Sequence, residues 1–339
     1  MKKISYLDIS IFMFYILQCY LFLFFISKSI NVVSYNYILY LVIAIFLGIS
    51  IILLFNYLFH LSNKNIFYNI NNKFIVFILV IIAFIFSIYS LNSITNYINY
   101  IYLIDINYFY IMLSFLLVIY FYIKNDIYSF FRCSTLVIYF YIFLEIITFI
   151  LLIFYIDITK LLPITYDLNN IMDNCYLFIC FLVIPLLFLL VIPKKMISGK
   201  KISKKIYFTY LIISLIIFIK SMISISILGY SGLSIYNYPD IIIYKNINLF
   251  SFIERIEWLL AFNSITNMFF MIGLCLFYVK EGLIYIFPIK KKSITTPLLI
   301  CLFCFIFGYF INISNIFIVW LLITFFSIHL AYAVFKLLK

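Results

Sequence analysis

Apolar residues along the chain gather into ten long runs, which short polar connections separate. The runs lie near 9–26, 37–59, 74–92, 108–123, 136–156, 176–193, 206–229, 257–279, 296–311 and 316–335. Most approach the ~20 residues that a helix needs to cross ~30 Å of hydrocarbon. Backbone groups in lipid must bond within their own segment, which favours helices over open strands. We therefore predict an all-α integral membrane protein with about ten transmembrane helices.

The composition agrees with a lipid environment. The 339 residues are 68% hydrophobic and 10% charged, whereas a soluble domain is about 45–50% apolar and about 25% charged. A single polytopic membrane domain over 1–339 is expected. The first run lacks a small-residue cleavage site, so we expect a retained helix and not a removable signal peptide.

The basic residues alternate between the two sides of the predicted bundle. The formal net charge is +12, and most lysines and arginines fall in every second connection. Because cytoplasmic loops carry an excess of Lys and Arg, both termini are predicted to be cytoplasmic. Topology thus explains the basic excess, and no nucleic-acid partner is expected. The basic side holds Lys2, Lys3, Lys64, Lys73, Lys124, Arg132, Lys194, Lys195, Lys200, Lys201, Lys204, Lys205, Lys280, Lys290, Lys291, Lys292, Lys336 and Lys339.

Ten spans divide into two sets of five, and an odd number makes the second set enter the membrane from the opposite side. Such inverted repeats, here about 1–156 and 176–335, build many secondary transporters with a substrate site where helices break. Span 6 carries Pro185, which removes a backbone hydrogen bond. In span 1, Gln18 and Cys19 interrupt the apolar run. These features predict either a midplane ligand site or a kinked helix with one interhelical hydrogen bond.

Two charged residues fall inside predicted spans. Glu145 lies about 10 residues into span 5, hence ~15 Å deep. Lys220 lies in span 7, and its long side chain could reach the outer interface. Glu145 is expected to be protonated, paired with Lys220 or another donor, or part of an ion path.

Scarce charges also gather at the outer end of span 8. Ser251 and Glu254 form an S-x-x-E capping box before an apolar run, and Arg255 and Glu257 accompany them. The capped helix end accounts for Ser251 and Glu254 alone. Several other acidic residues are also predicted on this outer side, namely Asp105, Asp157, Asp167, Asp173 and Asp240.

Motifs of known enzyme chemistry are missing from the sequence. It contains no GxSxG, no Walker-type GxxxxGK[ST], no HExxH and no Gly-rich dinucleotide loop. Cys301 and Cys304 lie one helical turn apart in an apolar run, where we expect them to act as packing residues. His60 and His329 lack a second ligand at metal-like spacing. We therefore expect no enzyme activity, no metal and no cofactor.

The outer connection before span 8 resembles a known family. Tyr-Pro followed by INLFSFIERIEWLL at 247–260 is similar to the signature of the endospore germination permeases, approximately Y-P, then I-x-x-x-D-F-L-E-R-I-E. The matching residues are Tyr238, Pro239, Ile247, Phe252, Glu254, Arg255, Ile256 and Glu257, with Ser251 in place of the aspartate. KLLP at 160–163 and Pro193 also agree with family landmarks in order and spacing.

The resemblance implies a function, a location and partners. Family members are the B-type membrane subunits of nutrient germinant receptors and are related to amino-acid/polyamine/organocation transporters. The chain would then lie in the inner membrane of the spore, sense a small nutrient such as an amino acid, and trigger germination together with A-type and C-type subunits. The expected pocket comprises Gln18, Cys19, Ser87, Ser90, Ile184 and Pro185, and the expected outer gate or docking motif comprises Tyr238, Pro239, Phe252, Glu254, Arg255 and Glu257.

Two other functions stay open on the sequence. One is an amino-acid permease coupled to protons or sodium, with Glu145 as the coupling residue. The other is a divergent scaffold subunit that binds no nutrient, because span 1 lacks the proline and small residues that are usual in the family.

Overall fold

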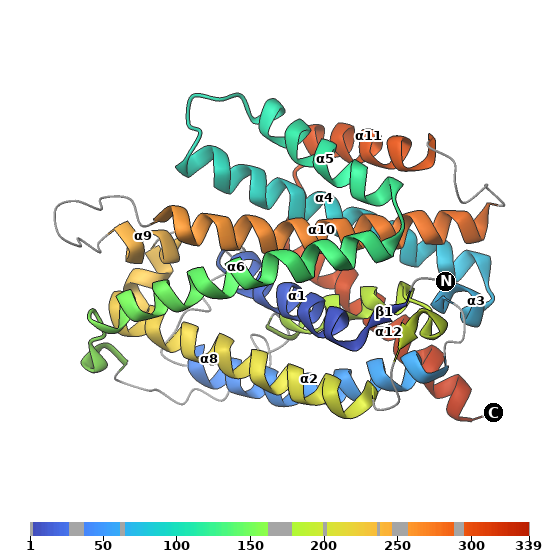
Figure 1. Cartoon of the computed structure of the whole chain (residues 1–339), viewed down its shortest axis with the longest axis horizontal. Helices are drawn as coiled ribbons and strands as arrows, with labels where there is room; N and C mark the ends of the chain where they lie inside the picture. The colour runs from blue at the N-terminus through green and yellow to red at the C-terminus, as the bar shows by residue number, and fades with distance from the viewer. Residues whose placement is uncertain are drawn as a thin grey trace.

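Helical structure coincides with each of the ten apolar runs in a computed structural model of the chain (Figure 1). The structure describes residues 3–26, 37–61, 65–161, 178–198, 202–235, 238–245, 257–287 and 295–338. The α-helices are α1 Tyr6–Ile26, α2 Tyr37–Leu61, α3 Ile66–Ile70, α4 Lys73–Ile101, α5 Tyr108–Lys124, α6 Ile127–Ile153, α8 Ile202–Ile235, α9 Pro239–Lys245, α10 Glu257–Ile286, α11 Thr295–Phe310 and α12 Asn315–Leu337. The 3₁₀ segments are η1 Ile158–Leu161, η3 Ile184–Val191 and η4 Lys194–Met196, and the strands are β1 Ile4–Ser5 and β2 Ile197–Ser198.

Six helical segments of the described chain are long and apolar enough to cross a membrane. They are Ile38–Leu61, Lys73–Ile101, Ile127–Ile153, Lys205–Tyr230, Leu260–Ile286 and Asn315–Leu337. Four further apolar helical segments are shorter, namely Leu7–Cys19, Tyr108–Lys124, Phe178–Val191 and Thr295–Phe310. An all-α membrane fold therefore fits the structure.

The surface of the bundle is apolar along several helices. On α6, Leu136, Phe143 and Ile150 are exposed, and α11 and α12 expose Phe303 and Trp320 in the same way. Large apolar side chains in such numbers mark a surface that needs an apolar solvent. These helix faces are therefore suited to contact lipid tails.

Several helices extend beyond the predicted apolar runs. The helix α6 begins at Ile127 and not near residue 136, and α4 continues to Ile101 and not to 92. In the added part of α6, Ser129 and Ser134 donate to carbonyls three residues earlier, those of Asp126 and Phe131. Polar side chains can thus lie within a helix, so hydropathy delimits its apolar part and not its ends.

Span 6 departs from a regular α-helix, and its break lies at the predicted proline. Residues 178–182 are α-helical, and the 3₁₀ segment η3 follows with Pro185 in its first turn. Leu186 N donates to Val183 O over 3.0 Å, an i to i−3 bond. Because proline has no N–H to donate, the α-helical pattern ends there. Span 1 shows no such break, since α1 runs through Gln18 without interruption.

The segment η3 lies at the centre of the fold. All of its residues are buried, and the ring of Phe188 lies 5.7 Å from that of Phe86, 5.4 Å from Tyr278 and 4.6 Å from Phe325. These partners come from α4, α10 and α12. The long helices α4 and α10 pack along each other beside it (Figure 1). The 3₁₀ segment is thus a core element and not a surface connection.

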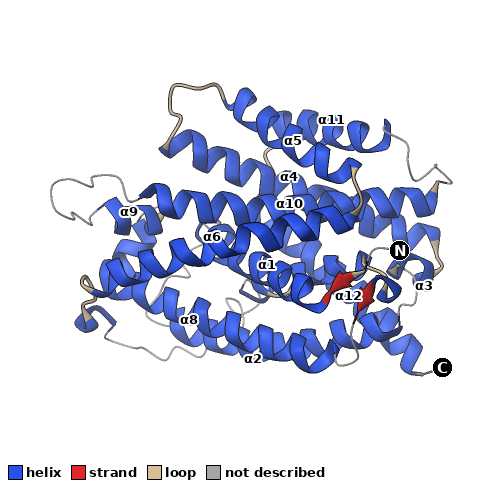
Figure 2. Cartoon of the chain, viewed as in Figure 1, coloured by secondary structure: helices blue, strands red, loops and turns tan. Residues whose placement is uncertain are grey.

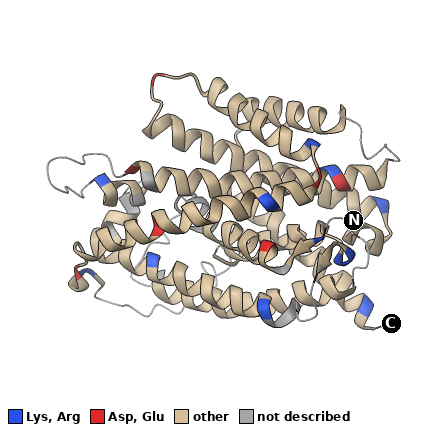
Figure 3. Cartoon of the chain, in the orientation of Figure 1, with Lys and Arg blue, Asp and Glu red and all other residues tan. Residues whose placement is uncertain are grey.

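The two ends of the chain lie at the same end of the bundle (Figure 1). There β1 pairs in parallel with β2, with Ile4 opposite Ile197 (Figure 2). At the start of α1, Ser5 N donates to the Asp8 carboxylate over 2.7 Å, and Asp8 N donates to Ser5 Oγ over 3.2 Å. This is a reciprocal cap of the helix start. Most of the described basic residues also lie at this end of the molecule (Figure 3).

One glycine in α8 has a backbone conformation that other residues avoid. Gly229 has φ 73° and ψ 169°, which divides α8 at a kink. Only glycine adopts this region readily, and the strain for another residue is about 1–3 kcal/mol. Gly229→Ala is expected to destabilise the protein by that amount, measured as unfolding in detergent. A Cβ at Gly229 would meet nothing within 4 Å, so an unchanged stability would show that the kink relaxes freely.

Candidate functional site

A cavity opens inside the bundle where α1, α6, α8, α9 and α10 meet. Its volume is about 70 Å³. A buried water needs roughly 10–15 Å³, so the cavity can hold several waters or one small polar molecule. Its polar lining includes Gln18, Tyr141, Glu145, Thr148, Lys220, Asn263 and Asn267, and its apolar lining includes Phe149, Leu152, Ile223, Ile243 and Leu260.

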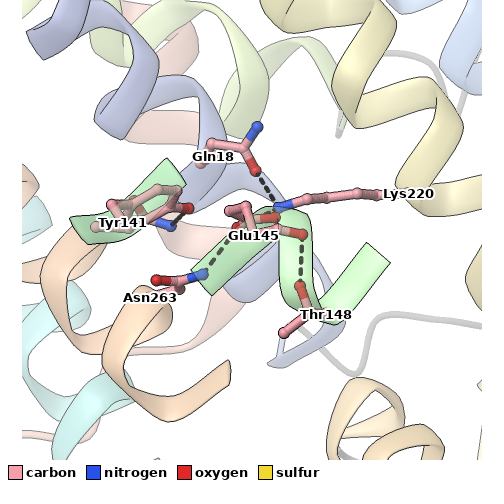
Figure 4. Close-up of polar contacts among 7 residues, drawn as sticks. Gln18, Tyr141, Glu145, Thr148, Lys220 and Asn263 are labelled. Carbon is pink, nitrogen blue, oxygen red and sulfur yellow. Dashed lines mark hydrogen bonds and ion pairs between the residues drawn. The ribbon is translucent and has the colours of Figure 1, made fainter. Parts of the chain in front are cut away.

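An ion pair crosses this cavity. Lys220 Nζ lies 2.7 Å from Glu145 Oε1, and it also donates to Gln18 Oε1 over 3.0 Å (Figure 4). The same carboxylate oxygen, Glu145 Oε1, also accepts from Asn263 Nδ2 over 3.1 Å. Four helices that are distant in sequence thus meet at one charged pair. In the structure Glu145 is paired with Lys220, as one of its predicted roles requires, and a part in an ion path stays a prediction.

Helical periodicity places these side chains on facing surfaces. In α6, Tyr141, Glu145, Thr148 and Leu152 recur every three or four residues, which aligns them on one face. In α10, Asn263 and Asn267 are four residues apart and share a face with Leu260. In α8, Ile223 and Ser224 follow Lys220 at the same spacing. The cavity is therefore built from one polar face of each of these helices.

Three buried side-chain amides line the cavity, and in each of them one polar atom makes no hydrogen bond to a described residue. Gln18, Asn263 and Asn267 are 2%, 3% and 6% exposed. Gln18 Nε2, Asn263 Oδ1 and Asn267 Oδ1 have no hydrogen-bond partner among the described residues. Buried polar atoms are nearly always paired, so each exception needs an explanation. A polar ligand or water in the cavity would have all three side chains as neighbours.

A small apolar cluster covers the cavity at the α9 side. Leu152, Ile223, Ile243 and Tyr244 pack together, separately from the main core. They come from the end of α6, from α8 and from α9. Along the chain, α9 follows the kink of α8 at Gly229. The cavity is thus bordered by the Glu145–Lys220 ion pair and, next to α9, by this apolar cluster.

The six residues of the expected pocket do not surround this cavity together. Gln18 lines it, whereas Cys19 is buried next along α1. Ser87 and Ser90 donate to carbonyls of their own helix, those of Phe84 and Phe86. Ile184 and Pro185 belong to the buried segment η3. Their role in ligand binding stays a prediction.

The outer motif is described in part. Tyr238 packs on Tyr97 with ring centroids 5.3 Å apart, and burial together with the nearby Tyr100 raises the pKa of Tyr238 to about 12. Pro239 begins α9, and Glu257 begins α10. The Tyr102 hydroxyl donates to the Glu257 carbonyl over 3.0 Å, while Glu257 Oε2 is buried without a described partner. The rest of the motif lies outside the described residues, namely Ser251, Phe252, Glu254 and Arg255.

Sequence reasoning missed several residues of the site. Asn263, Asn267, Tyr141 and Tyr244 line the cavity without having been predicted. The pair Asn263 and Asn267 carried a usable signal, because two amides four residues apart interrupt an otherwise apolar run. The tyrosines carried none, since the chain has 32 of them.

Metal chemistry has no visible site in the described parts of the chain. Those parts contain no group of three or more His, Cys, Asp or Glu residues that could hold a metal ion. Cys301 and Cys304 are buried free thiols, and Cys304 Sγ lies 3.9 Å from Ser87 Oγ. His329 is buried in α12, where its Nδ1 lies 2.8 Å from the Phe325 carbonyl. These side chains are buried within their helices, and their packing role stays a prediction.

Comparison with known proteins identifies the family. The sequence pattern of a family described as spore germination proteins matches residues 70–316. The chain belongs to this family. A search of the curated proteins gives no match. Membership confirms the resemblance to the family and, with the six long apolar helices, makes this spore germination protein a multi-pass membrane protein. The matched part contains Glu145, Lys220, Asn263 and Asn267, whereas Gln18 lies before it.

Proposed function

We propose that the chain is the membrane subunit of a spore germinant receptor, and that it binds a small nutrient such as an amino acid in the cavity at Glu145 and Lys220. One observation carries this proposal. Three buried amide groups, on Gln18, Asn263 and Asn267, line a cavity that an ion pair crosses, and each keeps one polar atom without a described hydrogen-bond partner. Buried polar atoms are usually paired, so unpaired ones that line a cavity support a polar ligand there. No chemical step is assigned to the chain, which we infer to be a sensor and not an enzyme.

The architecture that we propose has ten membrane crossings. Six long helices and four shorter apolar ones supply them, and the shorter helices α5 and α11 pack against each other and α4. Two sets of five would form an inverted repeat with the cavity between them. The gathering of basic residues at the end that holds both termini supports a cytoplasmic location of that end (Figure 3).

Membership in a family of spore germination proteins supports the location and the partners that we propose. The membrane would be the inner membrane of the spore, where A-type and C-type receptor subunits would read the ligand-induced change. Tyr238 directly precedes α9, Pro239 begins α9, and Glu257 begins α10. We propose that these elements contact the partner subunits.

A second candidate function is an ion-coupled amino-acid permease. The charged pair inside the bundle favours it, because intramembrane ion pairs often lie on ion or proton paths. Uptake of labelled amino acid into vesicles that contain the chain separates the two functions, because a receptor binds its ligand without accumulating it. A scaffold subunit would show neither uptake nor stabilisation by a ligand.

Deletion of the gene is the direct test of the receptor role. Spores without the chain are expected to lose dipicolinate release for one class of compound when they are exposed separately to amino acids, sugars and bile-type compounds. Reintroducing the wild-type gene should restore the response. Normal germination with every class, also in a strain without other receptors, would contradict the receptor role and favour the permease.

A further inference from the structure

We propose that a second, larger cavity of the molecule binds the head group of an anionic phospholipid. This cavity lies between the segment α3–α4 and the last turns of α12, and its volume is about 930 Å³. Ligand pockets commonly measure about 300–1,000 Å³, so it has room for a phosphate head group and its glycerol. It shares no lining residue with the cavity at Glu145 and Lys220. The inference therefore does not depend on what that site binds.

The position of the α4–α12 cavity matches the depth of lipid head groups. It lies where α4 begins and α12 ends, and both helices are long and apolar enough to cross a membrane. The ends of such helices reach the polar surface of the bilayer. This is also the end of the bundle where both termini and most described basic residues lie (Figures 1 and 3). Basic pockets between transmembrane helices are typical sites for anionic lipid head groups.

The charge around the cavity favours an anion. Its lining includes Lys336 in the last turn of α12 and contains no Asp or Glu. Lys73 is exposed at the start of α4, between the lining residues Asn72 and Phe74. The positive end of the α4 dipole adds to these two charges. A phosphodiester complements this arrangement, whereas a cation would be repelled.

The polar groups in the lining supply hydrogen-bond donors. Asn69 Nδ2 and Tyr332 Oη are buried atoms without a described hydrogen-bond partner. Two further lining amides already use their oxygen atoms. Asn71 Oδ1 accepts from Tyr285 Oη over 3.5 Å, and Asn72 Oδ1 caps the start of α4. These amides can therefore offer a ligand their N–H groups, and a phosphate accepts such bonds strongly.

The apolar part of the lining distinguishes a lipid from free phosphate. Phe74 and Phe335 are 71% and 56% exposed, and Ile75, Ile78 and Ile328 also line the cavity. These side chains come from one face each of α4 and α12, at spacings of three or four residues. Acyl chains of a lipid can lie along them below the head group. Free phosphate would leave this apolar surface without a contact.

A lipid in this cavity would bridge two parts of the fold. It would contact α4 and α12, which also pack directly against each other. In the proposed inverted repeat these helices belong to different repeats. Because the lipid binds only the folded arrangement, it should stabilise the packing of the two repeats in proportion to its concentration and affinity.

Thermal unfolding of the full-length chain in detergent, titrated with lipid, tests the inference. Phosphatidylglycerol should raise the unfolding temperature at concentrations roughly 10-fold or more below phosphatidylcholine, which has no net charge. Lys336→Glu should weaken the effect of phosphatidylglycerol by roughly 5- to 30-fold. Tyr332→Phe keeps the ring and removes one donor, so it should weaken the effect by roughly 10-fold.

Lys124→Glu is the matched control, because Lys124 is also exposed in the last turn of a helix, α5, but does not line the cavity. It should respond to phosphatidylglycerol like the wild type. Without added lipid, all variants should unfold near the wild-type temperature, which shows that they fold. Equal stabilisation by both lipids, or equal weakening by Lys124→Glu and Lys336→Glu, would overturn the inference. Stabilisation by glycerol phosphate at the concentrations that suffice for phosphatidylglycerol would also overturn it, because the ligand would then be a soluble phosphate.

Discussion

Lys220→Met is expected to be among the most destabilising single substitutions in the chain. Removing one partner of a buried ion pair costs about 3–5 kcal/mol, because the other charge stays without compensation. The Lys220 and Glu145 side chains are 26% and 20% exposed, so the lower end of that range is expected. The loss would be measured as a shift of the unfolding curve in detergent without ligand.

The double variant Glu145→Gln/Lys220→Met should recover most of that stability, since neither side chain then carries a charge and Asn263 can still donate to the glutamine oxygen. Lys336→Met is the matched control, because Lys336 is exposed at the end of α12 and its loss should stay within about 0.5 kcal/mol. A double variant that is as unstable as Lys220→Met would contradict the dominance of the charge pair and indicate that side-chain packing at the cavity is lost instead.

Much of the fold can be predicted from the sequence because lipid offers the backbone no hydrogen-bond partners. A run of about 20 apolar residues that must satisfy its own backbone has few options besides a helix. Pro185 marked the break in span 6 because the missing N–H acts locally. The full extent of α6 was not predictable from hydropathy, since Ser129 and Ser134 bond within their own helix. Apolar runs and proline thus predict where the helices lie more accurately than where they begin and end.

The sequence predicted individual polar residues of the site but not their arrangement in space. Gln18, Glu145 and Lys220 stood out as polar groups in apolar runs. Their meeting depends on the rotation of three helices about their axes, which no short stretch of sequence determines. Ser87 and Ser90 were misleading for a local reason, because a hydroxyl in a helix can bond to its own backbone. A polar residue in an apolar span therefore predicts that its side chain is hydrogen-bonded. It does not predict which residue is the bonding partner.

A mutation in the core segment η3 is the second large effect that we expect. Phe188→Ala removes a fully buried ring that contacts Phe86, Tyr278 and Phe325. In soluble proteins Phe→Ala costs about 3–5 kcal/mol through lost transfer energy and a new cavity. In lipid the transfer part is small because lipid tails are as apolar as the core. We therefore expect a loss near the lower end of that range, caused by the cavity.

Two comparisons make the Phe188 prediction decisive, with unfolding in detergent as the measurement. Phe188→Leu leaves a smaller cavity and should retain about half of the lost stability or more. Phe143→Ala applies the same change on α6, where the ring is 57% exposed at the bundle surface, and should cost less than about 1 kcal/mol. Equal losses for Phe188→Ala and Phe143→Ala would mean that η3 does not pack as a core element. A loss confined to Phe188 would establish that helices α4, α10 and α12 are held together through a 3₁₀ segment.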